Sequence, residues 1–290
     1  MDSSTTSKVH QNEHWTEVIR PSTNLLDLRL KEVWRYRDLL MLLVKRDFVA
    51  TYKQTILGPI WFFLQPVLTT LTFTIIFGRI AGLGTDGVPM MLFYMAGITL
   101  WNYFAECLNR TATVFKDNAS VFGKVYFPRL VMPLSIVVSN LVKLAIQFTL
   151  FLGFWLYYMY TTDAVHPNWT ILLTPVLILI MGGLGLGFGM IISALTTKYR
   201  DLVFLLSFGV QLLMYATPVI YPISQIPPKY RWAIMANPMS SIIETFRYGF
   251  TGSGSFSAQG LAYSGIFAIV TVVLGTIIFN KVERSFMDTV

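Results

Sequence analysis

The sequence is short of charge, and this shortage excludes an ordinary water-soluble protein. Only 13% of its 290 residues are charged and 54% are hydrophobic, whereas a soluble domain has roughly 25% charged residues. The same composition excludes disorder, because a disordered chain is poor in hydrophobic residues. The chain has one cysteine, Cys107, which has no second cysteine for a disulfide bond and so leaves the redox compartment open.

Motifs for chemistry are scarce as well. The only Gly-Lys pair, Gly123-Lys124, lacks the first glycine and the closing Ser or Thr of a nucleotide-binding P-loop. The three histidines, His10, His14 and His166, are scattered rather than grouped as metal ligands would be. We therefore expect this chain to have no catalytic residues, no metal site and no enzymatic activity of its own.

Long apolar stretches are abundant, by contrast, and they predict an all-α, polytopic membrane protein. Lipid offers the backbone no hydrogen-bond partner, so a crossing takes about 20 mostly apolar residues in a helix. Six stretches meet this requirement or nearly meet it: residues 59–80, 90–114, 138–160, 169–196, 202–221 and 259–280. Six transmembrane helices would place both termini on the same side of the membrane.

The basic residues indicate which side that is. Sixteen of the 22 lysines and arginines fall on the face that carries the termini, and four fall on the opposite face. Because short loops rich in Lys and Arg stay in the cytoplasm, both termini are predicted to be cytoplasmic. The net charge of +7 is thus explained by topology, and we expect no nucleic-acid partner.

The N-terminal region precedes the first crossing and differs from the rest in composition. Residues 1–24 are polar, and we expect them to be disordered. Residues 25–58 mix leucines with basic residues and contain no Gly or Pro before Gly58. This pattern predicts an amphipathic helix that lies along the cytoplasmic head groups. The alternative is a soluble helix packed on a partner.

Residues 222–259, on the opposite face, form a second unusual segment. They contain several prolines and two semi-apolar pieces, each of which is too short to cross a membrane. Such a pair predicts a re-entrant or interfacial helical hairpin, which is tolerated where protein or water covers its backbone. We interpret this segment as an outer gate, and a plain extracellular loop is the alternative.

A few polar residues and glycines interrupt the crossings. Glu106 and Arg110 are four residues apart and are expected to pair on one helix face. Lys143 is expected to lie shallow enough for its amine to reach the interface. The glycines of 182–189 indicate close helix packing, with a flexible channel wall as the alternative.

Three aromatic residues, Trp101, Tyr103 and Phe104, fall midway along the second crossing. Aromatic rings at membrane interfaces are common, but these lie far from either end of the helix. Their faces would suit the apolar C–H faces of sugar rings, so they are candidates for lining a channel. A packed interior would also use them.

Six motifs, taken in order, resemble those of one known family. They are residues 46–61 with Gln65-Pro66, 122–130 with Pro133-Leu134, 197–202, 215–222, 237–239 and 283–288. The set is similar to the membrane subunits of bacterial ABC exporters for polysaccharides, namely O-antigen, capsule and teichoic acid. The resemblance covers residues from about 30 to 290.

The resemblance implies a homodimer in the bacterial plasma (inner) membrane, served by two copies of a separate subunit that binds ATP and Mg²⁺. It implies export of a lipid-linked polysaccharide from the cytoplasm to the outer side, with residues 59–290 as the permease domain. Two rivals stay open. One is a drug or small-lipid exporter of the same superfamily, and the other is a channel or secondary transporter that needs no ATPase.

The resemblance also suggests which residues act. The loop 115–130 is expected to couple the permease to its ATPase by inserting aromatic side chains into a groove of that partner, through Lys124, Tyr126, Phe127, Pro128 and Arg129. A merely solvated basic loop is the alternative. The lipid head group is expected to enter beside Arg46, Tyr52 and Lys53, although attraction to anionic lipids explains these residues equally well. The outer gate is assigned Tyr215, Pro218, Tyr221, Asn237 and Pro238.

Overall fold

The computed structural model describes residues 30–53, 58–122, 127–199 and 201–287. Every regular element in these ranges is a helix, which confirms the predicted all-α class. The disorder predicted for residues 1–24 concerns a segment outside the described residues, so it stays a prediction.

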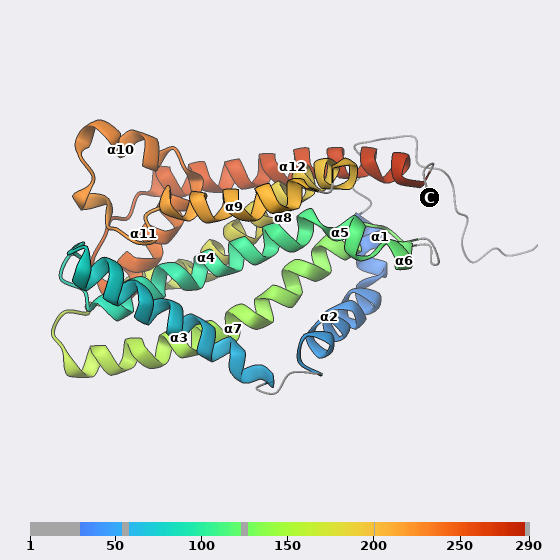
Figure 1. Cartoon of the computed structure of the whole chain (residues 1–290). Coiled ribbons are helices and arrows are strands. Elements are labelled where there is room, and N and C mark those ends of the chain that lie inside the picture. Colours follow the sequence, from blue (N-terminus) through green and yellow to red (C-terminus); the bar gives the residue numbers. More distant parts are fainter. Residues whose placement is uncertain (1–29, 54–57, 123–126, 200, 288–290) are drawn as a thin grey trace, which may run out of the picture.

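The bundle consists of long helices that all run between the same two ends of the molecule (Figure 1). They are α3 (Trp61–Phe73, preceded by η1, Gly58–Ile60, and continued by η2, Thr74–Ile80), α4 (Met90–Ala112), α7 (Val131–Thr161), α8 (Thr174–Lys198, preceded by η3, Trp169–Leu173), α9 (Leu202–Tyr215) and α12 (Ala258–Met287).

Shorter elements gather at each end of this bundle (Figure 1). One end, here named the α11 end, has α10 (Pro228–Met235), α11 (Pro238–Thr251), η4 (Ile223–Gln225) and the loops 81–89 and 162–168. The other, the α2 end, has α1 (Leu30–Arg35), α2 (Arg37–Tyr52), α5 (Val114–Asp117) and α6 (Ala119–Phe122).

Four helical stretches among the described residues are both long and apolar enough to cross a membrane. They are Trp61–Ile80, Val131–Thr161, Trp169–Lys198 and Ala258–Val282. These coincide with four of the six predicted crossings. The fifth predicted crossing, helix α9, is apolar but shorter, and the second, α4, is long enough but carries more polar residues.

Helix α4 lies at the centre of the core, and most of its residues are buried. It packs closely on α8 because α8 presents glycines at the contact. A Cβ atom on Gly185 would lie 2.7 Å from Cβ of Cys107, and one on Gly187 would lie 2.7 Å from the carbonyl carbon of Thr271 in α12. The glycine stretch therefore serves close helix packing, as the sequence indicated.

The amphipathic segment 25–58 is not one helix, as predicted, but at least two. A turn at Tyr36 separates α1 from α2. One face of the pair buries Val33 and Leu43 against aromatic residues that include Phe115 and Phe279. The opposite face leaves large apolar side chains exposed: Trp34, Met41, Leu42, Phe48 and Val49. The helix is thus apolar on both its packed and its open faces.

The segment 222–259 contains the two helices α10 and α11, which agrees with the predicted helical pair, and its entry into the membrane stays a prediction. Asn237 caps the start of α11 by accepting a hydrogen bond from the Met239 backbone N–H at 3.1 Å, and Pro238 fits the first helical position. Gly252, with φ of 75°, ends the helix in a left-handed conformation. Helix α11 is buried along almost its whole length, whereas α10 is exposed.

Candidate functional sites at the two ends of the bundle

Arg247 of α11 is the most deeply buried charge among the described residues, and it ties three elements together at the α11 end. Its guanidinium donates hydrogen bonds to the carbonyl oxygens of Pro218, at 2.5 Å, and of Val219. It also lies over the ring of Phe93 in α4, 3.7 Å from the ring centroid. Arg247 therefore holds the turn that follows α9 against both α11 and α4.

Glu244, one helical turn before Arg247, supplies the opposite charge. Its Oε1 atom lies 3.6 Å from Nη1 of Arg247, and both side chains are buried. Burial raises the pKa of the Glu244 carboxyl, and the neighbouring Arg247 guanidinium opposes that rise. Sequence reasoning missed this pair, although a Glu and an Arg three residues apart in a largely apolar piece could have signalled it.

The structure links the predicted gate residues through the turn that Arg247 holds. Asn237 donates a hydrogen bond to Oγ1 of Thr217 at 2.8 Å, which joins the start of α11 to the turn after α9. The Tyr221 hydroxyl donates to the Tyr215 carbonyl oxygen at 2.9 Å and closes that turn. Pro218 and Pro238 are buried, whereas Tyr215 is exposed. Their role in gating stays a prediction.

The α2 end is held by an ion-pair network around Asp47 of α2. This carboxylate lies 2.8 Å from Nη2 of Arg46 and 3.1 Å from Nη2 of Arg110 in α4. Arg46 also donates to Oδ1 of Asn118 at 3.2 Å. Lys53 is exposed just after α2. The side chain of Tyr52 lies outside the described part of the chain.

This network corrects the predicted pairing of Glu106 with Arg110. Arg110 reaches across to α2, and Glu106 instead lies 3.2 Å from Nζ of Lys143 in α7. Lys143, expected to extend alone toward the interface, therefore has a partner on the neighbouring helix. Both pairs join different helices, because Asp47 of α2 and Lys143 of α7 come within reach of α4 when the helices pack together.

The coupling loop is described only in part, and its buried residues correct one expectation. Lys124 and Tyr126 lie outside the described residues. Phe127, expected to enter a groove of the partner, is 5% exposed and stacks on Phe122 at 5.8 Å between ring centroids. The Arg129 guanidinium lies over the same Phe122 ring, and Pro128 follows Phe127 before α7 begins. A role of the loop in coupling stays a prediction.

The three aromatic residues proposed to line a channel lie instead in the packed core. Trp101, Tyr103 and Phe104 are all buried, and the Trp101 and Phe104 rings lie 5.4 Å apart. They face α8 and other core residues, so the packed-interior alternative describes them. Among the described residues, no three His, Cys, Asp or Glu side chains gather as metal ligands would.

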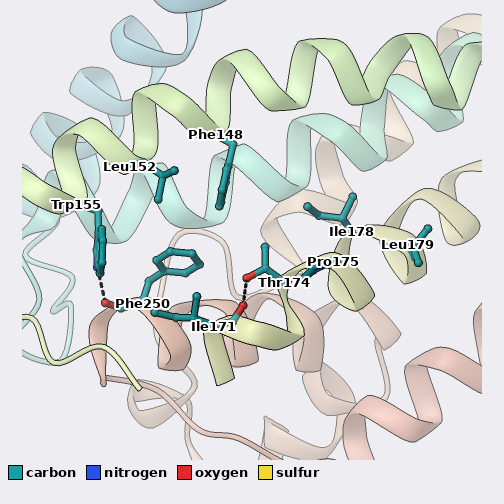
Figure 2. Close-up of a pocket in the computed structure, with 9 residues that line it drawn as sticks. All are labelled: Phe148, Leu152, Trp155, Ile171, Thr174, Pro175, Ile178, Leu179 and Phe250. Carbon is teal, nitrogen blue, oxygen red and sulfur yellow. Dashed lines mark hydrogen bonds between the residues drawn. The ribbon is translucent and has the colours of Figure 1, made fainter. Parts of the chain in front are cut away.

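An apolar cavity of about 650 Å³ lies between α7, η3 with α8, and α11 (Figure 2). It is lined by Phe148, Leu152, Trp155, Ile171, Thr174, Pro175, Ile178, Leu179 and Phe250. The Trp155 indole N–H donates to the Phe250 carbonyl at 2.7 Å, and the Thr174 hydroxyl donates to the Ile171 carbonyl at 2.6 Å. Because these polar groups are already paired, the cavity suits hydrocarbon rather than a charged ligand.

Long apolar helices around a buried central helix, with charged groups placed between helices and at both ends, define a multi-pass membrane protein. The chain belongs to the ABC-2 type transporter family, whose sequence pattern matches residues 38–251. Members of this family are membrane subunits that work with a separate ATP-binding subunit. The match covers most of the described helices, from α2 to α11.

Named relatives are similar to the chain over most of its length. The O-antigen export system permease protein RfbA of Myxococcus xanthus is 28% identical over 263 residues, which cover 90% of this chain and 98% of the relative. RfbA of Klebsiella pneumoniae is 27% identical, with 87% and 94% covered. The polysialic acid transport protein KpsM of Escherichia coli is 22% identical, with 84% and 93% covered.

Proposed function

We propose that this chain is the transmembrane subunit of an ATP-driven exporter that moves a lipid-linked polysaccharide from the cytoplasm to the outer side of the bacterial plasma membrane. The observation that carries the proposal is the near full-length similarity to permeases named for O-antigen export and polysialic acid transport. Membership of the ABC-2 type transporter family supports it. The working unit is a homodimer with two copies of a separate ATP-binding subunit.

Six crossings fit the arrangement of the helices. Helix α4 has 23 residues, and at 1.5 Å per residue it is about 35 Å long, enough for a hydrocarbon core of roughly 30 Å. Most residues of α4 are buried by its neighbours, so α4 need not be as apolar as a helix at the edge. Helix α9 has 14 residues and covers only about 21 Å, and the buried turn after it completes the crossing.

The orientation follows from the basic residues. The α2 end carries Arg46, Lys53, Arg110 and Lys116, and it is the end that we place in the cytoplasm. The exposed apolar face of α2 would then rest on lipid, while its opposite face packs on the bundle. The ATP-binding subunits would dock at this end, and α10 and α11 would form a re-entrant outer gate.

The proposal is tested with the complete complex, reconstituted from this chain and its ATP-binding subunit in liposomes. We expect lipid-linked polysaccharide to stimulate ATP hydrolysis at least threefold and to appear on the far side of the membrane only when ATP is present. A hydrophobic drug of similar size serves as the control substrate. Stimulation by the drug alone would favour the drug exporter, and movement of polysaccharide without ATP would overturn the ATP-driven mechanism.

A further inference from the structure

Two residues at the same level of the bundle are both exposed and are chemically opposite. Glu106 of α4 has a side chain that is 51% exposed, and Leu274 of α12 is 49% exposed. An apolar residue such as Leu274 suits a surface that faces hydrocarbon. Glu106 does not, because a carboxylate in contact with lipid is strongly unfavourable.

The contacts of α8 with its two neighbours fix this common level. A Cβ atom on Gly185 would lie 2.7 Å from Cβ of Cys107, the residue after Glu106. Two residues along α8, the Gly187 carbonyl oxygen lies 2.6 Å from the position of a Cβ atom on Gly275, the residue after Leu274. Glu106 and Leu274 therefore lie within about one helical turn of the same level.

This level is inside the apolar part of the bundle. On α12 the nearest charged residue toward the α2 end is Lys281, seven residues beyond Leu274. Seven residues of helix span about 10 Å on α12, and on α4 Arg110 follows Glu106 by one turn, so Glu106 lies about one to two helical turns inside the charged α2 end. A half-exposed charge at this depth is found where a helix faces water or a protein partner.

The residues around Glu106 form a continuous polar face. On α4, Asn102, Glu106, Asn109 and Arg110 recur on one side of the helix and are only partly covered, whereas most other residues of α4 are buried. Lys143 of α7 lies 3.2 Å from Glu106 and extends this face to the neighbouring helix.

Buried polar atoms beside this face have no hydrogen-bond partner among the described residues. They are Oδ1 of Asn109 in α4 and Oδ1 of Asn140 in α7, and Asn140 lies one turn before Lys143. Such acceptors are normally satisfied, by ordered water if by nothing else. They indicate that a hydrogen-bonding medium reaches the contact between α4 and α7.

We propose that this polar face of α4 and α7, formed by Asn102, Glu106, Asn109 and Lys143, lines a water-filled cavity within the membrane and contacts the hydroxyl groups of the polymer in transit. The second part rests on the proposed function. Carboxylate and amide oxygens accept hydrogen bonds from hydroxyl groups, and an ammonium group donates to them. A polyhydroxylated chain could therefore replace water as the hydrogen-bond partner of these side chains.

The test compares cysteine variants at the two matched positions in vesicles that contain the complete complex. The lone native cysteine, Cys107, is buried, so the unmodified chain serves as the blank. The probe is a charged, membrane-impermeant methanethiosulfonate, which needs an ionised thiol and hence water. We expect Glu106→Cys to react at least tenfold faster than Leu274→Cys. Equal rates, or no reaction of Glu106→Cys, would mean lipid or a second copy of the chain covers this face.

A further variant and a second measurement complete the test. If Glu106→Cys fails to accumulate, Asn102→Cys on the same face takes its place with the same expected contrast. After modification of the thiol, we expect polysaccharide export to slow at least fivefold, and unchanged export would overturn the contact with the polymer. Failure of the unmodified complex to export polysaccharide would count against the proposed function and would leave the labelling result standing.

Discussion

The charged groups at the two ends of the bundle are held in different ways. At the α11 end, Arg247 and Glu244 are buried, and the guanidinium is fixed by two backbone carbonyl oxygens and an aromatic ring. At the α2 end, Asp47 is shared between Arg46 and Arg110, both of which are partly exposed. The first network is enclosed by protein, whereas in the second the Asp47 side chain is 10% exposed and its arginine partners are 42% and 34% exposed.

This difference indicates that the two ends deform at different cost. A buried charge that loses its partner is left unsolvated, so breaking the α11 network is expensive. Partly exposed ion pairs are screened and can exchange partners for water at little cost. We infer that the α11 end holds one conformation firmly, and that the α2 end can rearrange when a partner binds there.

The largest expected effect follows from removing the buried arginine. Arg247→Met takes away both carbonyl contacts and leaves Glu244 buried without its partner, which should lower the free energy of unfolding by about 3–5 kcal/mol. Chemical unfolding in mild detergent measures the loss. Arg231→Met in the exposed helix α10 is the matched control and should change stability by less than about 0.5 kcal/mol. Equal effects of the two variants would abolish the contrast between a buried and an exposed arginine.

An intermediate effect is expected from the aromatic core at the α2 end. Phe127→Ala should lower the free energy of unfolding by about 3 kcal/mol, because it leaves a cavity against Phe122. Phe48→Ala, at a half-exposed position of α2, should cost about 1 kcal/mol in the same unfolding experiment. Similar losses at both positions would contradict the burial of Phe127. Tyr126→Ala alone then tests coupling in a transport assay without this packing defect.

The smallest effect is expected from the open ion-pair network. Asp47→Asn should lower the free energy of unfolding by about 1–2 kcal/mol, because Asp47 is nearly buried but its arginine partners are partly solvated, and the loss should shrink in high salt. Asp38→Asn on the same helix is the control, since this side chain is 93% exposed and its Arg37 contact is 3.9 Å long. It should leave the unfolding transition unchanged. A loss at Asp47 as large as that at Arg247 would show that the two ends are equally rigid.

Sequence reasoning predicted what depends on local composition. The all-α class, four helices both long and apolar enough to cross a membrane, the close packing at the glycines of α8 and the helical nature of 222–259 are all found in the structure. These features follow from apolar runs, prolines and glycines that are close in the sequence. The other two predicted crossings, α4 and α9, do not meet both requirements of length and hydrophobicity. Whether they can cross a membrane depends on the elements that pack around them.

Partners across helices could not be predicted in this way. Glu106 and Arg110 are well spaced for each other, but Lys143 and Asp47 come closer once the helices pack. Phe127 and Trp101 are aromatic residues in plausible positions for contact with a ligand, but they are buried in the protein's own core. A sequence gives the spacing along one helix and leaves open which face the neighbouring helices cover.

The amino-acid sequence by itself determined that this chain must lie in a membrane as helices, because its apolar runs have no other stable environment. The tertiary structure alone decided which polar side chains stay accessible within that apolar mass. The physical reason is that exposure depends on how neighbouring helices cover a face, and Glu106 and Leu274 share a level and are both exposed but belong to different helices.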